Sequence, residues 1–164
     1  MRRTQRRRGA QGFSLIELLI AMAIIAIIVA ISIPKLGTLI KNTRATAAEG
    51  NLNTFTKVLS QYATQYPDIG YPPSLAALGP PPNGSPAGAS AADLVGEDMA
   101  TAGTNPKQGY VFTYTPASGK PCTGYTLTAA PQNGAGTRYF FTDQNGQVRY
   151  NDNAPATASS PIVQ

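Results

Sequence analysis

The chain has 164 residues, enough for one modest domain, and a formal net charge of +5. Five of the thirteen basic residues precede residue 12, and the remainder of the chain holds eight basic and eight acidic groups. Those five are Arg2, Arg3, Arg6, Arg7 and Arg8. A formally neutral body offers no general attraction for nucleic acid. The absence of histidine removes the commonest general base and metal ligand, which excludes most hydrolytic mechanisms.

The only cysteine, Cys122, cannot form a disulfide within the chain, so the fold does not depend on one. The sequence shows no nucleophile paired with a base and no cluster of metal ligands. We therefore expect a protein that is not an enzyme and that needs no cofactor or metal.

Residues 13–33 form an uninterrupted apolar run whose only polar members are Ser14, Glu17 and Ser32. As a helix the run is about 31 Å long, which matches a bilayer core of about 30 Å. The arginines before it place residues 1–12 in the cytoplasm and the rest of the chain across the membrane, by the positive-inside rule. A secretory signal peptide would have a shorter apolar core and a small-residue cleavage site after it. An unprocessed signal anchor stays open as an alternative at this point.

Beyond Pro34 the pattern becomes amphipathic, and residues 35–66 are expected to continue the same helix. Its apolar stripe consists of Leu36, Leu39, Ile40, Leu52, Phe55, Leu59, Tyr62 and Tyr66. Pro34 is expected to kink the helix, and Gly37 and Gly50 each to weaken it by about 1 kcal/mol relative to alanine.

The remainder of the chain predicts a small α+β domain. Residues 67–106, rich in Pro and Gly, are expected to form a surface connection with short helices at 74–78 and 91–99. Residues 107–151 are expected to form an antiparallel sheet covered on one face by the helix. Its expected strands are 110–115, 125–130, 137–142 and 147–150, the last two joined by a turn at Asp143–Gly146. Residues 152–164 are expected to be a flexible tail.

The segment Gly12-Phe13-Ser14-Leu15-Ile16-Glu17 lies between the arginines and the apolar run. It resembles the prepilin processing site of type IV pilins and type II secretion pseudopilins, and Pro34 lies where pilins commonly have a helix-bending proline. The resemblance implies that residues 1–12 are a leader. It also implies that a membrane peptidase cuts after Gly12 and methylates the new amino group of Phe13, and that Glu17 is the carboxylate needed for assembly.

Glu17 has two physical interpretations. A carboxylate in an apolar helix costs about 2.5 to 3.5 kcal/mol at the bilayer centre, so a cationic partner such as the α-amino group of a neighbouring chain is expected. Alternatively, Ser14 and Glu17 have the spacing of a capping box at the helix start. The two roles are compatible, but a cap does not explain Gly12, Phe13 or the arginine-rich leader.

The order of long helix, connection and sheet is also similar to pilins. The resemblance implies a helical homopolymer as the function, with a prepilin peptidase, an assembly ATPase and its inner-membrane platform protein as partners. It places the subunit in the bacterial inner membrane among lipids, with its C-terminal domain in the periplasm, before it joins a periplasmic or surface filament. A secretion pseudopilus and a surface pilus are both open, although the lack of a second cysteine favours a pseudopilin.

Weaker signals add two alternatives. A DNA-uptake pilin would need a basic face, for which only four residues are available, so nucleic acid binding is not expected: Lys107, Lys120, Arg138 and Arg149. Tyrosines that could stack on single-stranded DNA are more simply explained by sheet packing: Tyr110, Tyr114, Tyr125, Tyr139 and Tyr150. Asp143, Asn145 and Asp152 resemble the calcium-binding loop of major pseudopilins, but Asn-Gly in a hairpin turn is the commoner explanation, so no metal site is predicted.

Overall fold

The computed structural model describes residues 13–163. It divides the chain into two compact units, residues 1–39 and residues 40–164. The boundary between the units lies inside helix α1 (Leu15–Gln65), which extends from the first unit into the second. We call residues 13–39 the N-terminal segment and residues 40–163 the folded domain.

Helix α1 confirms the long helix that the sequence predicts. It continues through Pro34, Gly37 and Gly50 without a break in its assigned residues. It ends two residues before Pro67, which has no backbone N–H and disfavours a helical conformation in the residue before it. A kink at Pro34 stays a prediction.

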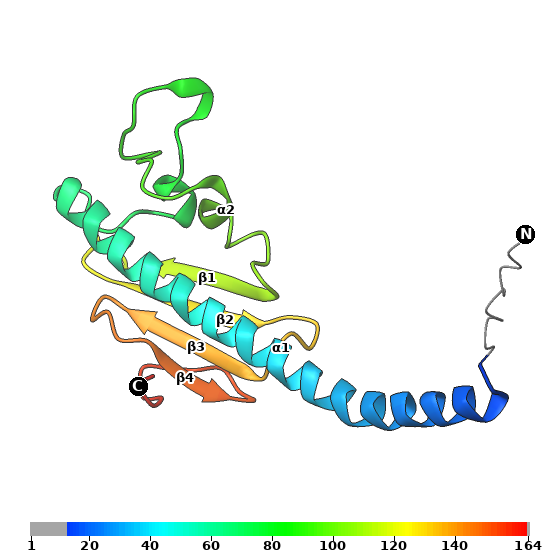
Figure 1. Cartoon of the computed structure of the whole chain (residues 1–164). Helices are drawn as coiled ribbons and strands as arrows, with labels where there is room; N and C mark the ends of the chain where they lie inside the picture. The colour runs from blue at the N-terminus through cyan, green and yellow to red at the C-terminus, as the bar shows by residue number, and fades with distance from the viewer. Residues whose placement is uncertain (1–12, 164) are drawn as a thin grey trace, which may run out of the picture. The chain divides into compact units, whose positions relative to one another are not determined.

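The sheet of the folded domain has four antiparallel strands in the order β1-β2-β3-β4 (Figure 1). The strands are β1 (Tyr110–Pro116), β2 (Tyr125–Pro131), β3 (Arg138–Asp143) and β4 (Arg149–Asp152). Each lies within two residues of its predicted bounds. The turn between β3 and β4 is also as predicted: the Gly146 amide donates to the Asp143 carbonyl at 2.9 Å. The α+β fold class is thus confirmed.

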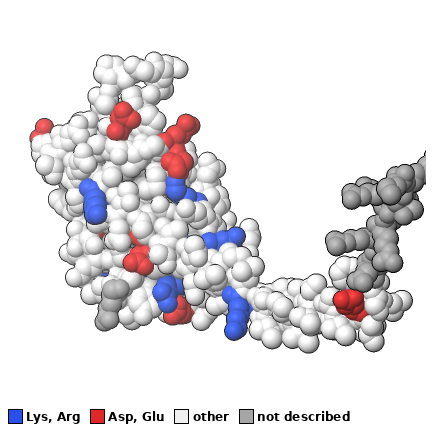
Figure 2. Space-filling view, in the orientation of Figure 1, with Lys and Arg blue, Asp and Glu red and all other residues white. Residues whose placement is uncertain are grey.

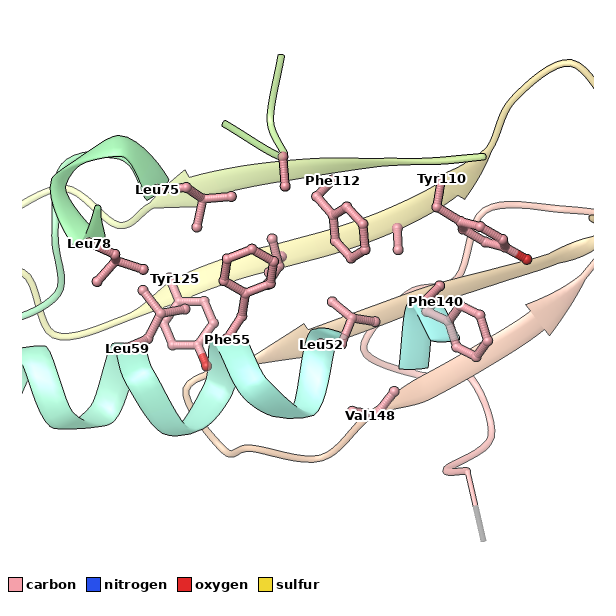
Figure 3. Packing of buried hydrophobic residues seen from close by; sticks show 14 of the residues in the cluster. Leu52, Phe55, Leu59, Leu75, Leu78, Tyr110, Phe112, Tyr125, Phe140 and Val148 are labelled. Atoms are coloured by element: carbon pink, nitrogen blue, oxygen red, sulfur yellow. The ribbon is translucent and has the colours of Figure 1, made fainter. Parts of the chain in front are cut away.

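The core of the folded domain lies between the C-terminal half of α1 and one face of the sheet (Figure 3). The predicted stripe supplies Leu52, Phe55, Leu59 and Tyr62, each with no exposed surface. Its first three members are at least 45% exposed, so the buried stripe begins later than predicted: Leu36, Leu39 and Ile40. Period-two alternation of strand residues explains the facing set, because every second residue points toward the helix. That set is Tyr110, Phe112, Tyr125, Leu127, Ala129 and Phe140. The rings of Phe55 and Phe112 lie 5.6 Å apart, in the range of favourable aromatic pairs.

The connection between helix and sheet is more than a surface link, and this part of the prediction was wrong. Leu75 and Leu78, in the 3-10 helix η1 (Leu75–Leu78), are buried in the main core. The helix expected at 91–99 is reduced to α2 (Glu97–Ala100). The reason is that residues 92–95 donate their backbone amides to carbonyls of residues 77–79 instead of to one another. A second 3-10 turn, η2 (Pro82–Gly84), lies at the exposed end of the connection.

The C-terminal tail also differs from the expected flexible segment. The Tyr150 amide donates to the Pro161 carbonyl at 2.9 Å, and the Val163 amide donates to the Val148 carbonyl at the same distance. The Arg149 guanidinium adds a bond to the Ser160 carbonyl at 2.8 Å. These contacts satisfy the outer edge of β4, which would otherwise present unpaired backbone groups. Composition alone misses this pairing because Pro, Ala and Ser have low strand propensity.

Candidate processing and assembly site

The candidate site begins where α1 begins. Ser14 is the residue before the first helical position, and Glu17 is the third helical residue. The Ser14 backbone N–H donates to Glu17 Oε2 at 3.4 Å, which is the carboxylate half of a capping box. The Ser14 carbonyl accepts the first helical bond, from the Leu18 amide at 3.2 Å. Glu17 therefore has a local capping contact, and its carboxylate is also exposed to anything that approaches the helix end.

Apolar side chains cover the N-terminal segment on all sides. Phe13 is 86% exposed, and the large apolar side chains between Leu15 and Leu39 are all at least 45% exposed. By length and composition, α1 could cross a membrane. On the face drawn in Figure 2 this segment is almost free of charge, whereas the folded domain shows acidic and basic groups interspersed. Such a surface requires an apolar environment, which residues 13–163 do not provide.

The other predicted site residues are placed as follows. Phe13 immediately precedes the capping residue, so the structure brings it and Glu17 together at one helix end. Gly12 and the leader lie outside the described residues. Pro34 lies within α1. Cleavage after Gly12, methylation of Phe13 and the assembly role of Glu17 remain predictions.

The acidic residues that resembled a calcium loop do not come together. Asp143 ends β3, whereas Asp152 pairs with Arg138 at the other end of that strand. The Asp143 carboxylate accepts a hydrogen bond from the backbone N–H of Asn145 at 2.9 Å, a turn contact, and Asp152 forms an ion pair with Arg138 at 3.1 Å. Within residues 13–163 no three His, Cys, Asp or Glu side chains lie together in a group that could hold a metal ion.

The tyrosines of the sheet contribute mainly to packing. Tyr110 and Tyr125 are buried, and burial raises the pKa of both, that of Tyr125 to about 12. The Tyr114 hydroxyl donates to the Pro72 carbonyl at 2.8 Å, and burial raises its pKa as well. These rings are not available for stacking on bases.

Three of the four basic residues considered for a DNA-binding face are engaged in local contacts. Lys107 forms an ion pair with Asp98, and Arg138 pairs with Asp152 and lies over the Tyr150 ring. Arg149 is bonded to the Ser160 carbonyl. No observation on the described residues favours a nucleic-acid surface.

Cys122 has a structural environment that sequence reasoning missed. Its thiol is buried, within 3.1 to 3.2 Å of the Ala117 and Gly124 carbonyls. Its backbone pairs with Ile69 and Tyr71, on both sides of Gly70. A Cβ at Gly70 would lie 2.0 Å from the Cys122 carbonyl oxygen, and Gly70 has φ +77. Only glycine fits this contact, which joins the segment after α1 to the connection between β1 and β2.

The arrangement defines a class of protein: a folded α+β domain carried on a helix whose first half is apolar on every side. A family model for the prokaryotic N-terminal methylation motif matches residues 7–33. The chain thus carries the signature of the type IV pilins and pseudopilins, whose members are substrates of a prepilin peptidase. No curated protein matches the chain significantly.

Proposed function

We propose that the chain is the precursor of a structural subunit of a membrane-anchored filament. A prepilin peptidase removes residues 1–12, methylates the amino group of Phe13, and releases the subunit for assembly. Its other partners are an assembly ATPase, an inner-membrane platform protein and further copies of the chain. The observation that carries the proposal is the exposed apolar N-terminal segment, which has one carboxylate near its start.

The exposed apolar surface of the N-terminal segment explains why the subunit lies first in lipid and then in a filament. Burying one large aliphatic side chain contributes about 1.5 to 3 kcal/mol, and the segment has more than a dozen. Lipid covers these side chains before assembly, and the same segments of neighbouring subunits cover them afterwards. In the filament the helices pack against one another through van der Waals contacts and the folded domains face outward.

Glu17 supplies the specific step of assembly. Cleavage creates an α-amino group at Phe13, and this charge needs a partner when the helix enters an apolar bundle. The Glu17 carboxylate of a neighbouring subunit is the acidic group closest in sequence to the new terminus. The capping contact with Ser14 is compatible with this role, because Ser14 keeps its amide N–H after cleavage.

Between the two kinds of filament, we favour a secretion pseudopilus. Type IV pilins often staple their C-terminal loop with a disulfide, and this chain has a single, buried cysteine. The C-terminal segment is instead held by backbone hydrogen bonds to β4. Before assembly, the folded domain is in the periplasm in either case.

Two substitutions separate the charge of Glu17 from its capping contact. Glu17→Gln keeps an oxygen that can accept the Ser14 amide but removes the charge, whereas Glu17→Ala removes both. We expect both variants to accumulate as processed monomers in the inner membrane, with sheared filament yield reduced at least about tenfold, because an unpaired buried charge costs several kcal/mol. Filament yield and membrane fractions are compared after co-expression with the assembly machinery.

Mass spectrometry of the N-terminal peptide is the control in the same experiment. The wild-type chain and both variants should begin at methylated Phe13, because Gly12 and Phe13 are unchanged in all of them. If Glu17→Gln assembles normally and only Glu17→Ala fails, the carboxylate is a cap and the assembly mechanism is wrong. A chain that retains residues 1–12 or is cut beyond Pro34 would contradict the processing step.

A further inference from the structure

Three Asn-Gly pairs lie in turns of the folded domain: Asn83-Gly84, Asn133-Gly134 and Asn145-Gly146. Such pairs are chemically labile, because glycine has no side chain to hinder attack by its own backbone nitrogen on the preceding side-chain amide. The three have the same intrinsic chemistry, so the structure around each decides how fast it reacts. We propose that Asn83 is a site of spontaneous modification on the folded protein, and that the other two are protected.

The step is an intramolecular condensation. The Gly84 backbone nitrogen loses its proton and forms a bond to Cγ of Asn83. The Cγ–Nδ2 bond then breaks, and the side-chain nitrogen takes up one proton and leaves as ammonia. A five-membered succinimide results. One water then opens the ring at either carbonyl, giving aspartate or isoaspartate at position 83. No oxidant or co-reactant other than water is required.

Ring closure requires Asn83 to leave its turn conformation, which has φ 54 and ψ 29, so that the Gly84 nitrogen can reach Cγ. The free energy of that local opening depends on the hydrogen bonds and packing contacts that hold the turn. Residues 82–87 are all exposed. The Ser85 amide donates to the Pro82 carbonyl at 3.2 Å, and no backbone hydrogen bond outside helices and strands joins residues 80–87 to other described residues. Opening this tip therefore leaves the core intact.

The turn at Asn133 has similar dihedral angles but stronger attachment. Asn133 has φ 50 and Gly134 has φ 72, close to Asn83 and Gly84. However, the Gln132 amide donates to the Gly109 carbonyl at 2.8 Å, which joins the turn to the start of β1. Ala135, directly after it, is buried. Opening this turn disturbs packing, so Asn133 should react more slowly than Asn83.

The turn at Asn145 is the best protected. The attacking nitrogen, that of Gly146, donates to the Asp143 carbonyl at 2.9 Å, and the backbone N–H of Asn145 donates to the Asp143 carboxylate at 2.9 Å. Gly146 also lies close to α1, since a Cβ built on it would be 3.3 Å from Thr56 Cγ2. Opening here would separate the hairpin from the helix.

The product changes the charge of an exposed surface. Asn83 and Glu97 line the same surface hollow, beside Pro80 and Pro81. The new carboxylate would therefore be added near an existing one, which makes the tip of the connection more acidic. Protein made at one time and aged would become a mixture of two charge forms.

The test follows all three pairs in the full chain, purified in detergent and kept in mildly alkaline buffer. Peptide mapping by mass spectrometry measures conversion, and enzymatic methylation of isoaspartate identifies the product. We expect Asn83 to convert at least about tenfold faster than Asn145, with Asn133 between them. In strong denaturant the three rates should become similar, because only the structure distinguishes them.

A pair of matched variants gives a second measurement. Gly84→Ala places a methyl group where no atom lies within 4 Å, and the methyl group should slow attack by the nitrogen that bears it, so that conversion of Asn83 alone slows. The positive φ of residue 84 strains the variant, and Gly134, at φ +72, imposes the same strain on the control. Gly134→Ala, the matched control, should leave conversion of Asn83 unchanged. Equal rates for the three pairs in the folded protein, or Asn145 converting first, would overturn the proposal. The wild-type rates decide the question even if a variant does not fold.

Discussion

The two halves of helix α1 have similar lengths and opposite apolar patterns. In the N-terminal segment, apolar residues occupy nearly every position and all the large ones are exposed. In the folded domain, apolar residues recur every three or four positions, and Leu52, Phe55, Leu59 and Tyr62 are buried against the sheet. One secondary structure thus meets two different demands, because the spacing of apolar residues determines what can cover the helix.

The comparison shows where each half obtains its stability. The second half is stabilised by its own sheet, so its contacts lie within one chain. The first half has no such partner among residues 13–163 and depends on lipid or on other copies. Substitutions in the two halves should therefore change different measurements.

Truncation of one core side chain is expected to have the largest effect. Phe55→Ala removes a fully buried ring that packs against Phe112, and should lower the free energy of unfolding by about 3 to 5 kcal/mol. Ile25→Ala, the matched control in the N-terminal segment, should leave the unfolding of the domain unchanged, since Ile25 is 60% exposed. Tyrosine fluorescence in detergent reports only on the domain, because residues 13–39 contain no tyrosine. A comparable loss of unfolding free energy in Ile25→Ala would contradict the view that the two halves of α1 are stabilised separately.

A smaller effect is expected in alkaline solution. Burial raises the pKa of Tyr125 to about 12. An unfolded tyrosine loses its proton near pH 10, so above that pH the unfolded state binds fewer protons and stability falls as pH rises. Each such tyrosine should lower the free energy of unfolding by about 1.4 kcal/mol per pH unit between its pKa in the unfolded state and its pKa in the folded state. Below pH 10 its contribution is fully present. Denaturant titrations at several pH values measure the slope.

Tyr125→Phe tests the cause of that slope. The Tyr125 hydroxyl is buried without a hydrogen-bond partner among the described residues, and the nearby Thr56 hydroxyl donates to Leu52 instead. Removal of the Tyr125 hydroxyl should change the free energy of unfolding little at neutral pH. It should also make the fall of that free energy above pH 10 shallower. An unchanged slope would mean that other groups cause the alkaline loss.

Periodic patterns account for what could be predicted from the sequence. The strands were found because their inward residues alternate, and the helix stripe because Leu52, Phe55 and Leu59 recur at helical spacing. The candidate site was found because Gly12, Phe13 and Glu17 are close in sequence, so no long-range contact was needed to place them.

The missed features depend on contacts between distant residues. The pairing of Gly70 with Cys122 joins segments fifty-two positions apart, and nothing around either residue indicates the other. Leu75 and Leu78 are isolated among prolines and alanines, so no periodicity predicts that they enter the core. The tail pairs with β4 through its backbone, and its side chains give no sign of that pairing.

Removal of the whole N-terminal segment should have the smallest effect on the folded domain, and it is the sharpest test of the comparison. A fragment of residues 41–164 keeps every described residue of the main core, whose first member is Ala45. We expect it to be soluble and monomeric, because the apolar side chains that need lipid have been removed. Its circular dichroism should show helix and sheet, and its unfolding free energy should lie within about 0.5 kcal/mol of that of the domain in the full chain.

A fragment of residues 51–164 is the matched control. It loses Ala45 and Ala48, which are 8% and 1% exposed, together with the helical turns that hold them, and should be clearly less stable. If the 41–164 fragment were insoluble or unfolded in neutral buffer, the N-terminal segment would be part of the domain's own stability, and the division of α1 into two independent halves would be wrong.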